Sequence, residues 1–435
     1  MKQLDINLMH PAEQLALIIG RIYRTGMTTT SGGNLSILDD NGDLWITPAS
    51  IDKGSLKPSD IMCVKPDGTV IGPHRPSSEY PFHRAIYRVN PQARSVIHAH
   101  PAGLVTFSIL HRVPDTRILP LTAQVCGPVG YADYAVPGSE LLGQKIVGAF
   151  QENPDCKAVI MENHGVVVFG SDIADAYGRF ESLEFCARTL LNARALGTPR
   201  LLTDEQLRLH RAALEIPERA LASVEHPSAE RSLRTELCGL VHRACTQGLM
   251  GTSYGSASVR LQGDDFLVTP EDLPRWNLEP EDIVQVCGGR AEPGKQASAA
   301  LALHAEIYRR NPKVNSVILT LTPALMAFCT TGAEFDVRTI PESWIFLQDV
   351  PVFPLVDKRS DLETIAEALL KRPFVMVESD TVVVTGDKLI NTFDRLEVAE
   401  FCARSLILAA PSGKLKPITD TQIDELRIAF HIGEP

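Results

Sequence analysis

The sequence lacks an uninterrupted run of 18 or more apolar residues, and Met1 to Asp5 contain no apolar signal core. These absences argue against a transmembrane helix and against export by a signal peptide. Basic residues are also in deficit, since 42 Lys and Arg against 53 Asp and Glu give a formal net charge of −11. A chain this acidic binds nucleic acid or an anionic membrane poorly, so we expect neither partner.

Cysteine is scarce and shows no pairing pattern. The nine cysteines stand singly, form no CxxC motif and are odd in number, whereas disulfide frameworks and structural zinc sites have regular close spacings. We therefore expect reduced thiols and a cytoplasmic location. Hydrophobic residues make up 44% and charged residues 22%, which is typical of a folded globular protein, and 435 residues are enough for two or three domains.

What the sequence does contain is an internal repeat. Three segments recur in order, at offsets of 222, 221 and 216 residues: GMTTTSGGNLS at 26–36 and GLMGTSYGSAS at 248–258, HRAIYRVNP at 83–91 and HAEIYRRNP at 304–312, and EFCAR at 184–188 and 400–404. Order and spacing kept over this distance indicate a tandem duplication. We place copy one at residues 1–215 and copy two at 216–435, with a polar, proline-bearing boundary at 217–232.

Both copies have the same pattern of helices and strands. Apolar residues at helical spacing predict helices over 12–25, 79–89 and 172–195. Alternating or continuous apolar residues predict strands at 35–37, 44–46, 95–97 and 166–169. Strands mixed with helices in both copies indicate the α/β class, but propensity does not determine the strand order.

The sharpest local feature of copy one is His98-Ala99-His100. In a strand, residues two apart point to the same side, so both imidazoles can face one metal ion. A tetrahedral site with one open position needs a third ligand. His164 offers it, at the turn between Glu162 and Gly165 that precedes an apolar strand. Each of these motifs alone is a weak signal.

Copy two supplies a test of this site. Four polar residues of copy one are replaced there: His98 and His100 by Leu319 and Leu321 (or by Thr320 and Thr322 if the one-residue gap falls earlier), His164 by Asp380, and Glu79 by Ala300. Both copies must fold, so a structural role would keep these residues in both. Their joint loss indicates a metal site in copy one and an abandoned site in copy two.

Other histidines do not follow this pattern. His83 is kept in copy two as His304, which favours a hydrogen-bonded scaffold role. His111 and His210 have no partner or spacing that recommends them, and we expect both at the surface.

Five segments resemble, in order and spacing, the class II aldolase/adducin family: SGGNLS (31–36), ITP (46–48), PSSE (76–79), IHAHP (97–101) and ENHG (162–165). The resemblance covers most of residues 10–200. It implies a three-layer αβα domain with a central, mostly antiparallel sheet, present twice. Copy two resembles the same family with its catalytic residues removed, so we expect it to be degenerate and non-catalytic.

The resemblance also implies the site residues. A divalent metal, normally Zn²⁺, would have the ligands His98, His100 and His164, with Glu79 as acid/base and as a further ligand before substrate arrives. Positions that match the family's phosphate-binding residues are Gly33, Asn34, Thr47, Ser77 and Ser78. Such a metal polarises a carbonyl and stabilises an enediolate, while the carboxylate moves the proton. No Schiff-base lysine is needed, and Lys53 suits a substrate-edge or surface charge.

The expected activity is reversible retro-aldol cleavage of a sugar phosphate or related hydroxy-ketone. Two departures leave the reaction open: the family's usual Thr-Pro-Ser-Gly is here TPAS at 47–50, and LPLT at 119–122 stands where fuculose-phosphate aldolases carry a catalytic tyrosine. Epimerases, decarboxylases and dehydratases use the same metal-enediolate chemistry, and adducin-type members are non-catalytic binding modules. Family members often form four-fold rings, so we expect a homo-oligomer in which two chains make a pseudo-tetramer.

Overall fold

The computed structural model describes residues 6–211, 226–355 and 362–432. The helices of copy one are α1 (Pro11–Arg24), α2 (Tyr80–Val89), α3 (Ala102–Ile109), α4 (Pro120–Cys126), α5 (Glu140–Glu152), α6 (Ile173–Leu196) and α7 (Asp204–Arg211). Its strands are β1 (Asn34–Leu38), β2 (Leu44–Ile46), β3 (Met62–Val64), β4 (Val70–Ile71), β5 (Ser95–Ala99), β6 (Val129–Ala132), β7 (Ala158–Met161) and β8 (Gly165–Gly170).

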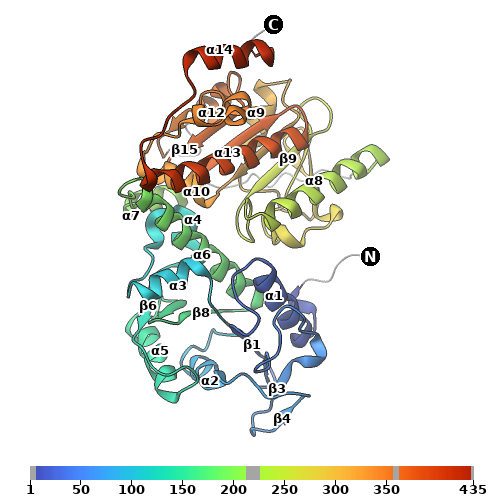
Figure 1. The fold of residues 1–435 in the computed structure, drawn as a ribbon. Coiled ribbons are helices and arrows are strands. Elements are labelled where there is room, and N and C mark those ends of the chain that lie inside the picture. The colour runs from blue at the N-terminus through green and yellow to red at the C-terminus, as the bar shows by residue number, and fades with distance from the viewer. Residues whose placement is uncertain (1–5, 212–225, 356–361, 433–435) are drawn as a thin grey trace. The chain divides into compact units, whose positions relative to one another are not determined.

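Copy two repeats this order (Figure 1). Its helices are α8 (Ser228–Thr246), α9 (Leu301–Arg310), α10 (Pro323–Thr331), α11 (Pro341–Leu347), α12 (Leu362–Ala368), α13 (Leu389–Ala409) and α14 (Asp420–Ala429). Its strands are β9 (Ser256–Arg260), β10 (Phe266–Val268), β11 (Val284–Cys287), β12 (Arg290–Ala291), β13 (Ser316–Thr320), β14 (Val352–Phe353), β15 (Phe374–Val377) and β16 (Thr381–Gly386).

Each copy is built on one eight-stranded sheet. The strand order is β4-β3-β2-β1-β5-β8-β7-β6 in copy one and β12-β11-β10-β9-β13-β16-β15-β14 in copy two. Neighbouring strands are antiparallel except at one edge of each sheet, where β6 pairs with β7 and β14 with β15 in parallel. The expected α/β class with a mostly antiparallel sheet, present twice, is confirmed.

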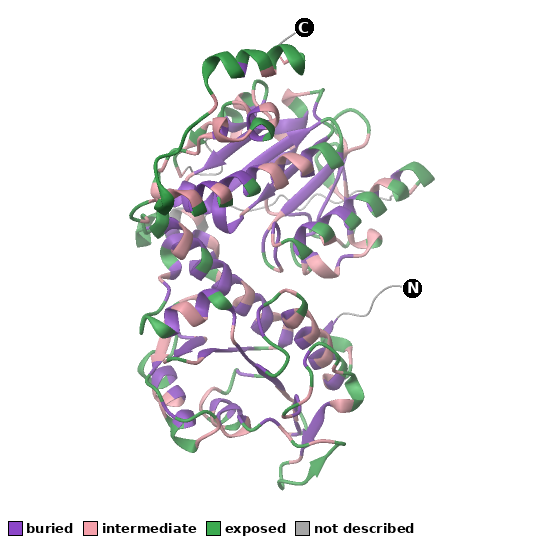
Figure 2. Cartoon of the chain, viewed as in Figure 1, coloured by how far each residue is buried: buried purple, intermediate pink, exposed green. Residues whose placement is uncertain are grey.

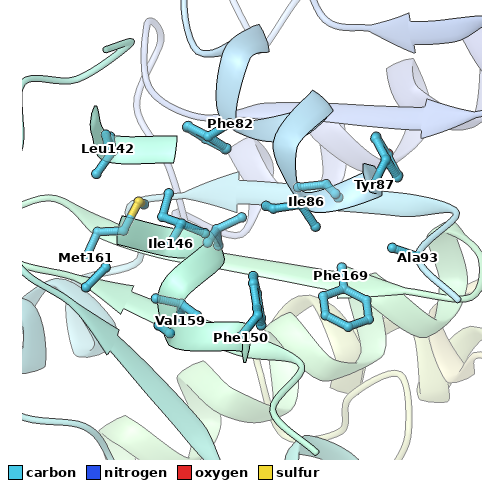
Figure 3. Close-up of a cluster of buried hydrophobic side chains, with 14 of the residues drawn as sticks. Phe82, Ile86, Tyr87, Ala93, Leu142, Ile146, Phe150, Val159, Met161 and Phe169 are labelled. Atoms are coloured by element: carbon cyan, nitrogen blue, oxygen red, sulfur yellow. The ribbon is translucent and has the colours of Figure 1, made fainter. Parts of the chain in front are cut away.

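Helices cover both faces of the copy-one sheet. On one face, α2 and α5 pack on alternate strand residues, in a cluster that includes Phe82, Ile86, Ile146, Phe150, Val159, Met161 and Phe169 (Figure 3). The intervening strand residues Ile97, Val166 and Val168 are also fully buried, because α1 and α3 contact the sheet as well. Strands buried on both faces, as Figure 2 shows, require an apolar layer on each side.

Most expected elements occur with ends shifted by a residue or two. The helix expected over 79–89 begins at Tyr80, with Glu79 as its N-cap residue. The strand expected at 95–97 continues to Ala99, which brings His98 into the sheet. Both shifts matter for the site, because they place Glu79 at a helix start and His98 on a strand.

Internal packing divides the chain into two compact units, residues 1–117 with 121–188, and residues 118–120 with 189–435. The boundary expected at 217–232 lies largely outside the described residues, and its last part is helical because α8 begins at Ser228. All nine cysteines are free thiols. In the described residues we find no helix long and apolar enough to cross a membrane.

Strand register settles how the two copies align. Asn34 in β1 lies opposite His98 in β5, and Ser256 in β9 lies opposite Leu319 in β13. Ser256 is the repeat counterpart of Asn34, so Leu319 is the counterpart of His98. His100 therefore corresponds to Leu321, and the alternative alignment with Thr320 and Thr322 is wrong.

Candidate metal centre

The site lies where three strands of copy one meet. His98 in β5 is paired with Asn34 in β1 and with Val167 in β8, and opposed residues of antiparallel strands present their side chains to the same face. His100 follows directly after β5, and His164 stands in the turn from β7 to β8. The preceding Asn163 has φ 51°, a left-handed conformation that asparagine adopts more readily than most residues.

The three predicted histidines converge. The Nε2 atoms of His98 and His100 are 3.0 Å apart, and the His164 ring centroid lies 4.8 Å from that of His98 and 5.1 Å from that of His100. One ligand nitrogen from each histidine lies within 4.8 Å of the other two. Zinc–nitrogen bonds of about 2.1 Å bring the nitrogens of one site to comparable separations, so this triad has the spacing to hold a metal ion.

The protonation states of the triad suit a metal. His98 Nδ1 lies 2.9 Å from the Val166 carbonyl oxygen, which only accepts, so Nδ1 carries a proton and Nε2 is the nitrogen that faces the site. Burial, reinforced by the neighbouring His98, lowers the pKa of His100 to about 3 and that of His164 to about 4. Both rings are therefore neutral at pH 7, the state in which imidazole binds a metal.

Glu79 lies beside the triad. Its Oε2 is 3.2 Å from His98 Nε2 and its Oε1 is 3.4 Å from His164 Nε2, while Asn34 Nδ2 donates to Oε2 at 2.7 Å. Burial acts to raise the pKa of Glu79, but His98 and the Asn34 amide outweigh it and hold that pKa well below its ordinary value. The carboxylate is therefore ionised.

Two buried atoms support the fit of a cation here. Glu79 Oε1 and His164 Nδ1 have no hydrogen-bond partner among the described residues. A buried, ionised carboxylate oxygen without a donor is costly, and a divalent cation held by the three imidazoles would compensate its charge. Nitrogen and carboxylate ligands of this kind are those of catalytic zinc sites.

Sequence reasoning missed a hydrogen-bond chain behind Glu79. His83 Nε2 lies 2.5 Å from Asn34 Oδ1, and His83 Nδ1 lies 2.7 Å from Ser36 Oγ. Because the Asn34 amide nitrogen already donates to Glu79, Asn34 Oδ1 accepts from His83. The retained His83 is thus a scaffold residue that also holds Asn34 against Glu79. The sequence did contain a signal for this chain of hydrogen bonds. His83 is kept in copy two as His304, whereas Asn34, which lies between His83 and Glu79, is replaced by Ser256 just as Glu79 is replaced by Ala300.

Two of the predicted phosphate positions use their hydroxyls within the scaffold. Thr47 Oγ1 accepts from the Leu35 amide at 3.1 Å, and Ser77 Oγ accepts from the Glu79 amide at 3.3 Å. Both hydrogen bonds recur in copy two, at Thr269 and Ser298. These hydroxyls therefore position β1 and the Glu79 cap in the structure described.

The glycine loop packs directly on the histidines. Gly33 has φ 74°, and a Cβ there would lie 2.8 Å from the His98 carbonyl oxygen, so only glycine fits. A Cβ on Gly32 would lie 3.0 Å from His100 Nδ1. Ser78, the remaining predicted phosphate position, is exposed. The structure thus brings Gly33 and Asn34 to the triad.

Lys53 is not a surface charge, contrary to expectation. It is 2% exposed, and its Nζ donates to the Pro48 carbonyl at 2.8 Å. Its backbone amide donates to Thr30 at 2.9 Å, so the residue joins the glycine loop to the TPAS segment. Burial lowers the pKa of Lys53 to about 8. In copy two the same position is the buried Arg275, bonded to three carbonyl groups.

These features define a class of protein: an α/β domain with a mostly antiparallel sheet that carries three converging histidines beside a buried carboxylate. The family model of the class II aldolase and adducin N-terminal domain matches residues 13–191 and again 235–407. The chain therefore belongs to the class II aldolase/adducin family and contains the domain twice, as a tandem duplication.

Individual relatives match the length of one domain. The 3-oxo-tetronate 4-phosphate decarboxylase of Haemophilus influenzae is 31% identical over 201 residues, which are 45% of this chain and 94% of that protein. The L-fuculose phosphate aldolase of Methanocaldococcus jannaschii is 33% identical over 187 residues, 41% of this chain and 96% of that protein. A solved L-fuculose 1-phosphate aldolase structure matches 46% of this chain and 93% of its own, with 28% identity and a TM-score of 0.42.

Proposed function

We propose that copy one is a metal-dependent lyase that cleaves a carbon–carbon bond in a sugar phosphate or related hydroxy-ketone, by reversible retro-aldol cleavage. The observation that carries this proposal is the convergence of three imidazoles and a buried carboxylate on one point. Relatives of one-domain length are named as aldolases and decarboxylases of phosphorylated sugars or sugar acids, which supports the reaction class.

In this proposal His98, His100 and His164 hold a divalent cation, Zn²⁺ being the best match to three nitrogen ligands; another divalent metal would fit the same donors. A cation bound there would supply Lewis acidity toward the oxygen atoms of the substrate carbonyl and hydroxyl. Val166 keeps His98 in the required tautomer through its carbonyl.

Glu79 is the proposed acid/base and an additional metal ligand in the absence of substrate. Its Oε1 has no competing donor among the described residues, so this oxygen is available to take or return the proton at the reacting carbon. Asn34 fixes Oε2 by a 2.7 Å hydrogen bond. General acid–base groups of this kind contribute roughly 10²–10⁴-fold to rates.

Substrate phosphate is proposed to bind at the glycine loop and the adjacent helix start, with Gly33, Asn34, Thr47, Ser77 and Ser78 as the contact positions. Backbone amides of such turns suit a phosphate dianion. Because the Thr47 and Ser77 hydroxyls accept from the backbone and donate to no other residue that the structure describes, both are proposed to donate to the ligand.

A second candidate reaction is decarboxylation, and one observation favours it. Retro-aldol cleavage needs a group that deprotonates the substrate hydroxyl, and the 119–122 segment offers none: Leu119 and Thr122 are fully buried, and Thr122 Oγ1 donates to the Thr116 carbonyl. A β-keto acid loses CO₂ without that deprotonation. The epimerase, dehydratase and non-catalytic alternatives have no such support.

Copy two is proposed to be degenerate and non-catalytic. At the positions equivalent to the three histidines and Glu79 it has Leu319, Leu321, Asp380 and Ala300. We propose residues 1–215 and 216–435 as the two domains, a cytoplasmic location in keeping with nine free thiols, and a homodimer that forms a pseudo-tetramer of domains. No nucleic-acid or membrane partner enters this proposal.

Metal analysis and product detection test the function. The purified chain, supplied with Zn²⁺, should bind about one ion per chain, and fewer than about 0.1 ion per chain would overturn the proposal. Phosphorylated ketoses and 3-oxo sugar acids should be screened for release of aldehyde and of CO₂ separately. Glu79→Gln should lower product formation roughly 10²–10⁴-fold, whereas Ala300→Gln, at the equivalent helix start of copy two, should leave it unchanged.

A further inference from the structure

Copy one has a second cavity away from the metal centre, between α2 and the turns that follow β1 and β3. Its volume is about 340 Å³, within the range of sites that hold small molecules. It borders Leu38, which stands at the end of β1 opposite to Asn34. At 3.3 Å per strand residue these two positions are about 13 Å apart. This α2 cavity is therefore separate from the glycine loop and its proposed phosphate positions.

The wall of the α2 cavity is basic and aromatic. α2 contributes Tyr80, Arg84, Tyr87 and Arg88, and the turn after β3 contributes Lys65. Arg84 and Arg88 are one helical turn apart, so their guanidinium groups are neighbours on the helix surface. Both arginines are exposed, and neither has a hydrogen bond or ion pair with any residue that the structure describes. Two cations thus stand at this cavity without a protein anion.

Copy two supplies the anion from its own chain. Arg88 is kept there as Arg309, but its helix neighbour Ala85 is replaced by Glu306. The Glu306 carboxylate accepts from Arg309 at 2.6 Å and 2.9 Å, which compensates the charge of this guanidinium within copy two. Copy one has the cation without the carboxylate, so the charge is left for a ligand to pair with.

Copy two also covers the equivalent tyrosine with its own side chain. Leu38 is replaced by Arg260, whose guanidinium carbon lies 4.6 Å from the centroid of the Tyr308 ring. The Arg260 guanidinium donates to the Tyr308 and Asn311 carbonyl oxygens at 2.9 Å and 2.8 Å. Tyr308 is the counterpart of Tyr87. In copy one the shorter, neutral Leu38 stands beside the cavity instead.

Other members of the wall are lost in copy two: Tyr80, Arg84 and Lys65 correspond to Leu301, Ala305 and Cys287. Both copies must fold, and α2 and α9 occupy the same place in the two domains. A purely structural role would therefore keep these residues in both. Their joint loss in the copy that also lacks the histidine triad indicates a function that belongs to copy one.

The charges of the wall favour a phosphate ester as the ligand. Lys65 is paired with Asp43 at 2.6 Å, so Arg84 and Arg88 carry the cationic charge that is free to bind. Planar guanidinium groups bind phosphate oxygens in pairs, and tyrosine rings offer apolar surface to an organic group. The net charge of −11 disfavours a polyanion such as nucleic acid, and the cavity volume suits a small molecule.

One wall of the α2 cavity is connected to the metal centre. Tyr87, which also belongs to the buried cluster of Figure 3, has its Oη 2.8 Å from Ser36 Oγ. Ser36 Oγ lies 2.7 Å from His83 Nδ1. His83 bonds to Asn34, which donates to Glu79. A ligand against Tyr87 would therefore touch the hydrogen-bond chain that orients the proposed acid/base.

We propose that the α2 cavity is an effector site for a small phosphate monoester, with Arg84 and Arg88 on the phosphate and Tyr80 and Tyr87 beside the organic group. The effector role rests on the proposed function, because it acts through Glu79. The binding of the anion does not depend on that function.

Isothermal titration of the full chain with phenyl phosphate tests the site, since this probe carries a phosphate on one aromatic ring. Arg84→Ala copies Ala305, and Ala85→Glu copies Glu306. Each should raise the Kd at least about tenfold, because each removes or neutralises a charged hydrogen-bond donor of the ligand. Arg309→Ala, in copy two, is the matched control and should leave the Kd unchanged. No detectable binding, or a Kd that neither copy-one variant changes, would overturn the inference.

Leu38→Arg separates a built cavity from a patch of surface charge. This variant keeps Arg84 and Arg88 and adds a third cation, but it places a guanidinium over Tyr87, as Arg260 does in copy two. If the ligand needs the cavity, the Kd should rise at least about tenfold. Tighter binding would mean that charge alone attracts the probe and would overturn the inference.

Chemical labelling locates the bound probe. Phenylglyoxal reacts with exposed guanidinium groups, and peptide mass analysis identifies the labelled residues. Phenyl phosphate should protect Arg84 and Arg88 from this reagent, whereas the exposed Arg309 should react equally with and without the probe. Binding without protection of Arg84 and Arg88 would place the probe elsewhere, for example at the glycine loop, and would overturn the inference.

Linkage with the metal tests the effector role. Two coupled ligands change each other's affinity by the same factor, so the Kd of phenyl phosphate should differ at least about fivefold between the Zn²⁺-loaded and metal-free chains. Tyr87→Phe, which lacks the hydroxyl bonded to Ser36, should abolish this difference, and Tyr308→Phe should leave it intact. Equal Kd values in the two wild-type forms would overturn the effector role.

Failure of this inference is distinguishable from failure of the proposed function. A chain that binds Zn²⁺ and releases product, but whose Arg84 and Arg88 are not protected, would refute the effector site alone. A chain that binds phenyl phosphate at these arginines but binds no metal would refute the enzyme proposal and keep the anion site.

Discussion

At the position of the histidine triad, copy one has glycines packed closely against the imidazoles, whereas copy two has larger side chains at the equivalent positions. Gly165, where a Cβ would lie 2.7 Å from His100 Cδ2, is replaced by Thr381, whose hydroxyl donates to the Thr320 carbonyl at 3.0 Å. The histidine ring itself requires the glycine in copy one. Without that ring, copy two carries a side chain with its own hydrogen bond.

The glycine loop shows the same replacement. Gly32, packed against His100, becomes the buried Tyr254, and Thr28 becomes Met250, whose side chain packs on Gly255. Thr28 Oγ1 in copy one is buried with no hydrogen-bond partner among the described residues. Copy two has therefore lost more than four ligating side chains: its neighbouring residues also differ in size, so restoring the histidines alone would not restore the surroundings that hold them in copy one.

The largest expected effect comes from replacing a proposed metal ligand of copy one with the residue found at the equivalent position of copy two. His98→Leu fills the buried position with the residue found at Leu319 but removes a metal ligand. We expect bound metal to fall from about one ion per chain to below about 0.1, with loss of measurable product formation, as elemental analysis and the product screen would show. The reverse change, Leu319→His, should add no metal; a second bound ion would contradict the view that copy two is refilled.

The next effect concerns the space for His100. Gly165→Thr, which copies Thr381, places a Cβ 2.7 Å from both the Ala99 carbonyl and the His100 ring. We expect the ring to shift and metal affinity to fall about 10–100-fold, as for other changes to groups that orient a ligand. Competition with a chromophoric chelator measures the affinity. Thr381→Gly is the control and should cost only about 1 kcal/mol, through one lost hydrogen bond.

A smaller effect should follow from the residue between His83 and Glu79. Asn34→Ser copies Ser256 and can still accept from His83, but it is too short to reach Glu79. We expect kcat to fall about tenfold with metal content unchanged, because Glu79 loses the donor that orients it. Steady-state kinetics and metal analysis are measured together. Equal loss of metal and activity would show that Asn34 supports the ligands instead; Ser256→Asn should change neither.

The smallest expected effect is on how the free energy of unfolding depends on pH. It comes from a buried glutamate that accepts hydrogen bonds from amides at the start of α3 in copy one and of α10 in copy two. Glu184 accepts from the Gly103 and Leu104 amides at 3.0 Å each, and burial raises its pKa from 4.5 to about 7. Glu184 therefore stays protonated to a higher pH in the folded state than in the unfolded state. The stabilisation that this protonation gives the folded state is full below about pH 4.5 and is lost as pH rises through 7. Between pH 6 and 8 the loss is about 1 kcal/mol.

Denaturant unfolding of copy one at several pH values would measure this slope, and Glu184→Gln should flatten it. Glu400, the counterpart in copy two, also has a raised pKa through burial but gains a hydroxyl donor from Thr322. Glu400→Gln is the matched variant. An unchanged slope in both variants would mean that neither cap titrates in this range.

Much of the site was accessible from the sequence because one copy served as the control for the other. The triad and Glu79 stood out as residues lost together, and the structure brings them within contact distance. Lys53 was misjudged, because a lysine is normally exposed and nothing in its sequence neighbourhood shows that Nζ meets the Pro48 carbonyl. His210 was misjudged for a similar reason, since its partner Asp380 lies 170 residues away.

By itself, then, the sequence determined the duplication, the α/β class and the set of candidate ligands, because these depend on local periodicity and on differences between two aligned copies. Only the tertiary structure decided which alignment is correct and how His83 and Asn34 orient Glu79. These features depend on strand register and on contacts between residues 45 or more positions apart, and local sequence patterns carry no information about either.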